Sequence, residues 1–381
     1  MKRVLVIVLV VIMALSLFTA CGQKSNTIKV GINMELSGAV ATYGEDTVKG
    51  IELAIEQINA AGGIDGKQIE VVKYDNKSDA AEATTLATKL MTGDKVLAVM
   101  GPATSGAFKA EIPVAIQNKV SVISGSATAD DVTVDDSGVK EYAFRICFND
   151  SYQGTAMANF AASDLTKSKA VIIKDSSSDY SKGLAESFTA AFTSAGGSIV
   201  SEEAYVAGDT DFNAVLTKIK DMDFDVIFIP GYYEEAGLII KQARALGISV
   251  PILGADGFDS PVLAELAGAD AANDVYFSNH YSSLDQSPIV QDFIKAFKEK
   301  YNADPNAFNA LGFDLAKFTI DGISRASEMN GEAVKEALAG TQNFEGVTGT
   351  FSVGEDHNAV KALVVIEMQG GQQVSSVRAG V

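Results

Sequence analysis

The feature that most limits the fold of this chain is the alternation of short apolar runs with amphipathic helical stretches. Runs rich in Val and Ile predict strands at residues 28–34, 69–74, 96–100 and 120–124. Helical patterns separate them, the first over residues 48–58 and ended by Gly62 and Gly63. This alternation predicts a parallel sheet that is covered by helices on both faces.

The same alternation begins again after Asp150. Strand patterns follow at residues 170–174, 198–205, 226–229 and 251–253, again separated by helical patterns. The 381 residues are enough for two domains of common size, so we expect two similar halves. Residues 275–368 carry further strand and helix patterns, which form either a third unit or the missing parts of the two halves.

The N-terminus has the pattern of an export signal. Lys2 and Arg3 precede an apolar run over residues 4–18, which at about 15 residues is shorter than the roughly 20 of a spanning helix. Thr19 and Ala20 before Cys21 resemble a bacterial lipobox, although Phe18 departs from it. We therefore expect a signal peptide over residues 1–20, lipidation of Cys21 and a flexible tether over residues 21–27. A retained membrane helix is the alternative.

Charge and cysteine content exclude other classes. The formal charge is −19, which disfavours nucleic acid as a partner. Cys147 is the one cysteine besides Cys21, so a disulfide within the mature body is not expected. Because Cys147 lies in the apolar run 144–148, we expect a buried thiol.

Signatures of enzymes are missing from the sequence. It has no G-x-G-x-x-G after the first strand, no phosphate-binding loop and no G-x-S-x-G elbow. His280 and His357 lack partner spacing, and we expect each to be a surface or strand-end residue rather than a metal ligand or catalytic base. We expect no enzyme activity, no cofactor and no metal; a hydrolase built from scattered residues stays open as an alternative.

Ligands of open α/β sheets bind beyond the carboxyl ends of the strands, and the loops there have an unusual composition. In the first half, residues 101–106 and 124–129 offer small residues, hydroxyl groups and backbone N–H groups, which suit a carboxylate. Helix capping explains either loop alone equally well.

The corresponding loops of the second half combine aromatic and acidic residues. Tyr232 and Asp256 follow two successive strands, and residues 175–180 add a third polar loop. Together they suit an ammonium group, although Tyr232 alone suits packing and Asp256 alone suits a turn. A carboxylate site and an ammonium site facing each other would fit an α-amino acid.

Over residues 27–368, the chain resembles the type I periplasmic binding proteins of the branched-chain amino acid (Leu/Ile/Val) transport family. The resemblance rests on the order and spacing of several short segments: Ser37-Gly38 through Tyr43-Gly44, Ile58-Asn59 through Gly62-Gly63-Ile64, Tyr74-Asp75, Gly101 to Ser105, Ala127-Thr128, Tyr180, Gly231-Tyr232-Tyr233, Gln242-Ala243-Arg244 and Gly254 to Gly257.

The resemblance implies two doubly wound parallel-sheet lobes joined by a hinge. The N-terminal lobe would comprise residues 28–147 and 279–354, and the C-terminal lobe residues 148–278 and 355–381. It also implies an extracytoplasmic lipoprotein that binds a free amino acid and passes it to an ABC transporter permease, as a monomer.

Site residues are implied by the same resemblance. Ser105, Ala127 and Thr128 would bind the α-carboxylate, and Asp256, where some relatives have Glu, would bind the α-ammonium. Tyr180 and Tyr232 would seal the cleft, and Tyr43 would line the side-chain pocket. The alternative that stays open is a receptor for another small ligand such as an amide, urea or an aromatic acid.

Overall fold

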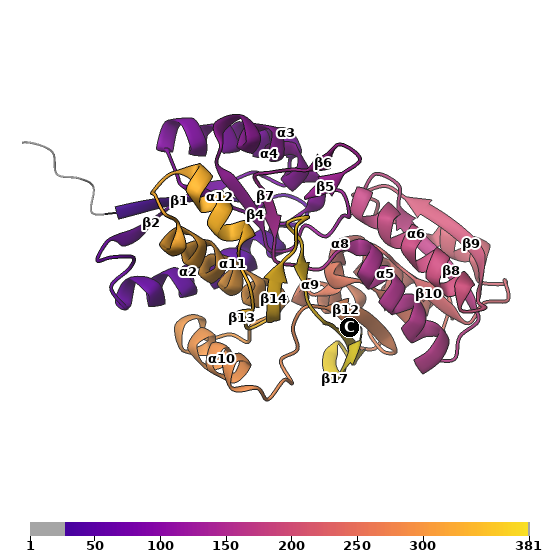
Figure 1. Ribbon diagram of the computed structural model, residues 1–381. Helices are drawn as coiled ribbons and strands as arrows, with labels where there is room; N and C mark the ends of the chain where they lie inside the picture. Colours follow the sequence, from indigo (N-terminus) through magenta and orange to yellow (C-terminus); the bar gives the residue numbers. More distant parts are fainter. Residues whose placement is uncertain (1–26, 380–381) are drawn as a thin grey trace, which may run out of the picture.

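The computed structural model describes residues 27–379, which form two α/β lobes lying side by side (Figure 1). The predicted signal peptide, Cys21 and the tether up to residue 26 lie outside the described residues. Within residues 27–379, no helix is both long and apolar enough to cross a membrane. We call the half built on a five-stranded sheet the first lobe and the half built on a seven-stranded sheet the second lobe.

The sheet of the first lobe is parallel throughout and has the order β2-β1-β3-β4-β7. Every residue of β3, β4 and β7 is buried, as expected for strands covered on both faces. The strands are β1 (Thr27–Met34), β2 (Gln68–Asp75), β3 (Ala98–Met100), β4 (Ser121–Ser124) and β7 (Ala143–Arg145), beside a small hairpin of β5 (Val134–Asp135) and β6 (Gly138–Val139).

The sheet of the second lobe has the order β17-β16-β12-β11-β10-β8-β9. Its last two strands along the chain, β16 and β17, run antiparallel to their neighbours. The strands are β8 (Lys169–Asp175), β9 (Ser198–Tyr205), β10 (Val226–Phe228), β11 (Ile252–Gly254), β12 (Val275–Asn279), β16 (Leu363–Gln369) and β17 (Gln372–Ala379); β13 (Phe344–Gly346), β14 (Gly349–Val353) and β15 (Ala359–Val360) form a separate small sheet.

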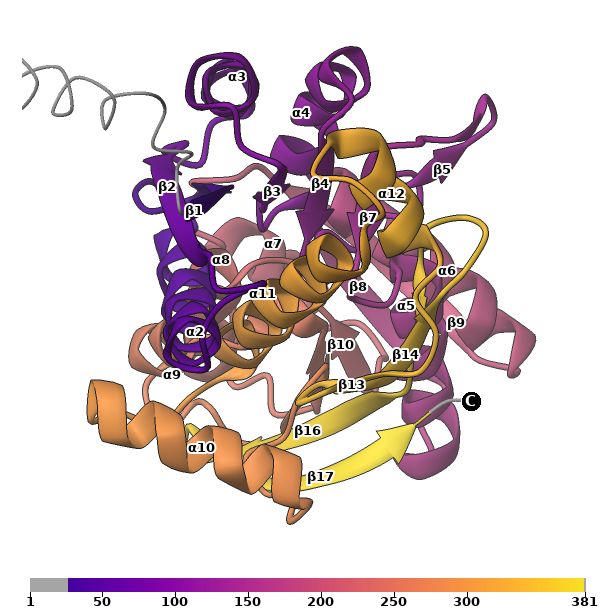
Figure 2. The same ribbon diagram turned by 60° about the vertical axis from the view of Figure 1, so that its left-hand side comes forward.

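Helices cover both sheets. Figure 2 shows α3 and α4 on one face of the first sheet and α2 and α11 on the other. The helices are α2 (Ala41–Ala60), α3 (Ala80–Thr88), η2 (Lys89–Asp94), α4 (Ser105–Asn118), α5 (Asp150–Asn159), η3 (Phe160–Asp164), α6 (Asp179–Ser194), α7 (Asn213–Ile219), α8 (Tyr233–Ala245), η4 (Asp256–Phe258), α9 (Pro261–Ala267), α10 (Pro288–Tyr301), α11 (Ala307–Arg325) and α12 (Gly331–Ala339).

The C-terminal part of the chain contributes to both lobes. Helix α11 packs along α2 and contacts β3 and β4, whereas β16 pairs with β12 of the second sheet. In Figure 1 the orange helices α11 and α12 accordingly lie among the indigo and purple elements. The tail is therefore not a third unit. The residue numbers given above for the lobe boundaries stay a prediction.

Two glycines allow α2 and α11 to approach at backbone distance. A Cβ atom on Gly50 would lie 2.0 Å from the Asn309 carbonyl oxygen, and one on Gly312 would lie 2.0 Å from that of Thr47. The close approach fixes the relative position of these two helices. Both helices carry side chains of the cleft described below.

Each sheet reverses its strand order at one point. In the first lobe the reversal lies between β1 and β3, and in the second between β8 and β10. The loops beyond the carboxyl ends of these four strands line a crevice in each lobe. The fold thus places the polar strand-end loops singled out in the sequence where a ligand would bind.

The sequence patterns miss several elements of the fold, among them β7, α5 and β17. Strand β7 and helix α5 lie where the chain crosses from one lobe to the other, and neither shows a clear period. Helix α5 has almost no one-sided apolar face, because Asp150 and Gln153 are among its buried residues. Strand β17 is an edge strand of largely polar residues, so it lacks the apolar run that marks a central strand.

Candidate functional site

A buried carboxylate shapes the loop after β3 in the first lobe. Glu35, which follows β1, accepts hydrogen bonds from the N–H groups of Ala103 (2.9 Å) and Thr104 (3.0 Å) and from the Thr104 hydroxyl (2.7 Å). Ser105 then begins α4 and is itself buried. This arrangement fixes the start of α4, and Ser105 lines the cavity described below.

The loop after β4 lies beside it. The N–H group of Ala129 donates to the Ser105 hydroxyl oxygen at 3.1 Å, which joins the two loops. Arg145 supports this loop from behind by donating to the carbonyl groups of Ala127 (3.2 Å) and Ala129 (2.8 Å). The Thr128 N–H group makes no hydrogen bond within residues 27–379. The loops after β3 and β4 therefore present N–H and hydroxyl groups on the first lobe.

The second lobe places the Asp256 carboxylate at the end of β11. Its Oδ1 atom accepts from the Tyr180 hydroxyl at 2.8 Å and from Gln153 Nε2 at 3.0 Å, and its Oδ2 atom lies 3.3 Å from His280 Nε2. Burial lowers the pKa of His280 to about 4, so the imidazole is neutral at pH 7. Asp256 is thus a buried acceptor that is surrounded by neutral donors.

Aromatic rings enclose the space above Asp256. Tyr180 and Tyr232 stack with their centroids 5.1 Å apart, and Tyr43 from α2 meets Tyr232 edge-on at 5.6 Å and stacks on Phe308 of α11 at 4.3 Å. Burial raises the pKa values of Tyr43 and Tyr180 well above that of an exposed tyrosine, so both side chains keep their hydroxyl protons. The rings form apolar walls with hydrogen-bond donors at their tips.

The cleft between the lobes is closed. Its cavity holds about 10 Å³, roughly the room for one water molecule. The residues that line it are Tyr43, Ala103, Thr104, Ser105, Ser126, Tyr180, Tyr232, Asp256, Gly257 and Phe308. An amino acid is much larger, so the lobes or their side chains must move apart before one can enter.

Direct contacts between the lobes hold this closed arrangement. The Tyr43 hydroxyl donates to the Gly257 carbonyl, and the Tyr233 hydroxyl donates to the Ala39 carbonyl at 3.2 Å. At the edge of the cleft, Lys109 Nζ lies 2.7 Å from Asp179 of the second lobe. Each of these contacts is worth little alone.

The structure gathers the predicted site residues around one point. Tyr43, Ser105, Tyr180, Tyr232 and Asp256 all line the closed cavity. Ala127 and Thr128 do not line it, but they are buried in the adjoining loop after β4. The ligand contacts assigned to these seven residues stay predictions.

Other residues of the site escape sequence reasoning. Gln153 gives no sequence signal, and Phe308 reads as an ordinary core residue of a helix. His280 does follow a strand, as expected, but it is buried beside Asp256 and not at the surface, because it lies where the chain crosses between the lobes. His357 is likewise buried and stacks on Phe144 at 4.0 Å.

The residues offer little for metal or thiol chemistry. Within the described part of the chain, no three His, Cys, Asp or Glu side chains come together as a metal site would require. Cys147 is buried, as expected, and burial raises the pKa of its thiol to about 12. A thiol with such a pKa is a poor nucleophile at neutral pH.

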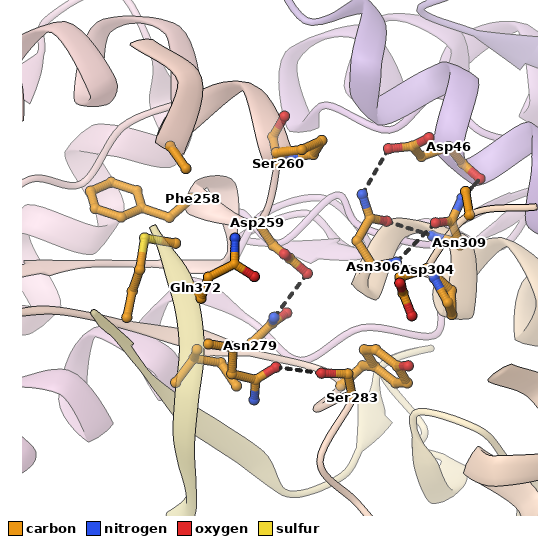
Figure 3. Close-up of a pocket in the computed structure, with 18 of the residues that line it drawn as sticks. Asp46, Phe258, Asp259, Ser260, Asn279, Ser283, Asp304, Asn306, Asn309 and Gln372 are labelled. Carbon is orange, nitrogen blue, oxygen red and sulfur yellow. Dashed lines mark hydrogen bonds between the residues drawn. The ribbon is translucent and has the colours of Figure 1, made fainter. Parts of the chain in front are cut away.

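A larger cavity of about 460 Å³ lies elsewhere between the lobes (Figure 3). Asp46, Asp259 and Asp304 line it, together with amide side chains such as Asn306 and Asn309. Lys49 also lines this cavity and pairs with Asp46 at 2.8 Å, so its one lining lysine already has a carboxylate partner. Neither the loop after β3 nor the loop after β4 reaches this cavity. The small cleft at Asp256 is therefore the better candidate for an amino acid.

Comparison with known proteins decides the family. The sequence profile of the periplasmic binding protein family matches residues 27–373. The chain belongs to the periplasmic binding protein family. A leucine-, isoleucine-, valine-, threonine- and alanine-binding protein of Pseudomonas aeruginosa is 31% identical over 344 residues, which cover 90% of each chain.

Solved structures of this family give the same fold. The branched-chain amino acid transporter substrate-binding protein LivJ of Streptococcus pneumoniae, in complex with isoleucine, is 44% identical and superposes with a TM-score of 0.88 over 92% of this chain and 99% of that one. The leucine-binding protein LivK of Thermotoga maritima is 33% identical, with a TM-score of 0.85 over 92% and 98%. The type I periplasmic binding protein fold predicted from the sequence is confirmed.

The closed arrangement generates a prediction for Tyr43→Phe. This variant keeps the ring but loses the hydrogen bond to Gly257 of the other lobe, which is worth about 0.5–1.5 kcal/mol. The ratio of open to closed molecules should rise by about two- to tenfold. Energy transfer between fluorescent labels at the exposed positions Thr88 and Glu186, one on each lobe, would measure it.

Tyr142→Phe is the matched control for this measurement. Its hydroxyl donates to Glu332 at 2.9 Å, within the first lobe, so its removal should leave the ratio unchanged. An equal ratio of open to closed molecules in the two variants would contradict a role of Tyr43 in closure.

Proposed function

We propose that this protein is the extracytoplasmic substrate-binding component of an ABC transporter and that it binds a free amino acid, preferably Leu, Ile or Val, between its lobes. The observation that carries the proposal is the Asp256 carboxylate, which is buried among neutral donors and lies across the cleft from the N–H and hydroxyl groups at Ser105. An α-amino acid supplies the missing cation and, on the next carbon atom, an anion for the opposite loop.

Each predicted residue then has a physical role. The ligand's ammonium group binds Asp256, and its carboxylate binds Ser105, Thr128 and the backbone at Ala127. No arginine lines the small cleft, which suits a carboxylate held by N–H and hydroxyl groups. Tyr43, Tyr180 and Tyr232 enclose the ligand and exclude water.

The relatives support a preference for amino acids with a branched side chain. Their names include leucine, isoleucine and valine binding, and the Streptococcus pneumoniae relative was solved with isoleucine. A relative from R. palustris was solved with benzoate, at 25% identity. Benzoate carries no cation for a buried carboxylate such as Asp256, which favours an amino acid over an aromatic acid in this chain.

Transport would follow from opening and closing of the lobes. We propose that residues 28–147 with 279–354 move as one body against residues 148–278 with 355–381. A ligand that contacts both bodies favours the closed state because its two charges are satisfied only there. The closed monomer would deliver the ligand to the permease.

Calorimetric titration tests this function. Leu, Ile or Val should bind wild-type protein at micromolar or lower concentration and, at 100 times the dissociation constant, stabilise it against unfolding by about 2.7 kcal/mol. Asp256→Asn should weaken binding by about a hundredfold or more, because the ligand's buried ammonium group loses its partner.

The control is Asp270→Asn, which removes an exposed carboxylate of the same lobe and should leave affinity unchanged. Failure of every amino acid to bind the wild type, or unchanged affinity in Asp256→Asn, would refute the proposed function.

We further propose that Cys21 carries the lipid that keeps the protein at the membrane. The proposal rests on the basic start, the apolar run and the small residues before Cys21. Cys21→Ser should move the protein from the membrane fraction to the soluble fraction and abolish incorporation of labelled fatty acid. Unchanged membrane association of this variant would argue for a retained helix instead.

A further inference from the structure

A second carboxyl group lies directly behind the first. Asp150 begins α5 and is fully buried, and Gln153 lies one turn further along the same helix. The side-chain amide of Gln153 donates to Asp150 Oδ1 at 2.9 Å and to Asp256 Oδ1 at 3.0 Å. The two carboxyl groups therefore share one amide group.

Within residues 27–379, no cation balances this pair. Arg145 donates to Asn358 and to backbone carbonyl groups of the loop after β4, and Lys361 donates to the carbonyl of Ile146 and to Thr348. The other titratable groups that act on the pair are acids or neutral at pH 7: Tyr43, Asp130, Cys147, Tyr180, Tyr232, Asp259 and His280. Two buried carboxyl groups this close together without a cation do not both ionise.

Hydrogen bonding decides which of the two is charged. Asp256 receives donors from Tyr180 and Gln153 and faces the neutral imidazole of His280. Asp150 accepts a hydrogen bond from Gln153 at Oδ1, and its Oδ2 atom has no hydrogen-bond partner within residues 27–379. Donors stabilise the ionised form, so the charge belongs on Asp256. Burial and the Asp256 charge raise the pKa of Asp150 well above its usual value, in the same sense.

We propose that Asp150 carries the proton of this pair and that Asp150 and Gln153 are positioning residues, which present Asp256 as the one carboxylate for the ammonium group of the ligand. The inference deepens the proposed function and rests on it. Gln153 also accepts hydrogen bonds from Ser278 (2.8 Å) and from the Asp256 N–H group (3.3 Å), which fixes its amide orientation. Gln153 thus connects α5, η4 and β12.

Infrared spectroscopy of the ligand-free protein tests where the proton lies. At pH 7 the wild-type spectrum should contain a carbonyl stretch of a protonated carboxylic acid that is missing from the spectrum of Asp150→Asn. Burial also raises the pKa of Glu111, Asp259 and Asp314, and any band from these acids should be equal in both spectra. Carbon-13 labelling of the aspartate carboxyl groups should shift this band in the unmutated protein, which separates it from any band of the buried Glu111. Gln153→Leu should raise its frequency, because the hydrogen bond to Asp150 is gone.

Affinity for leucine provides the second readout. Asp150→Asn mimics the neutral acid and should bind within about threefold of wild type at pH 7, whereas Asp256→Asn should lose about a hundredfold or more. Asp130→Asn is the matched control: this neighbouring acid accepts from Ser151, and its replacement should change neither the infrared band nor the affinity.

The inference is overturned if Asp150→Asn keeps the infrared band, or if it loses as much affinity as Asp256→Asn. A different result would refute the proposed function alone: wild-type protein binds no amino acid, although the infrared band is assigned to Asp150.

Discussion

The candidate site depends on the buried carboxyl group of Asp256, which forms no ion pair with a lysine or arginine within residues 27–379. Asp256 is surrounded by the hydroxyl of Tyr180, the amide of Gln153 and a neutral His280. Hydrogen bonds reduce the cost of burying a carboxylate. A cation that binds in the same desolvated space stabilises the carboxylate further. The aromatic walls and the polar loops of the opposite lobe follow from this requirement, since they select a cation that brings its own anion.

The fold explains how two weakly polar crevices become one site. Each sheet reverses its strand order once, and the loops at the two reversals face each other across the cleft. Helices α2 and α11, which meet at Gly50 and Gly312, carry Tyr43 and Phe308 to the same place. The direct contacts between the lobes are individually weak, and in the proposed function the ligand's two charges would add to them in the closed state.

Sequence reasoning predicts the parts of this site that local patterns encode. Strand runs locate the loops, and Ser105 and Asp256 stand out because they follow strands. Family resemblance added Tyr43, which lies inside a helix and has no local signal. Gln153 and the buried state of His280 were beyond reach, because they arise where the chain crosses between the lobes and brings helix α5 behind β11. Polar strand β17 was missed since an edge strand needs no apolar run.

The central claim is that both charges of one zwitterion drive closure. Calorimetric titration of leucine, leucinamide and 4-methylpentanoate tests it most directly, because leucinamide lacks the carboxylate and 4-methylpentanoate lacks the ammonium group. The account predicts that each analogue binds at least about a hundredfold more weakly than leucine. Binding of either analogue within about tenfold of leucine would contradict it.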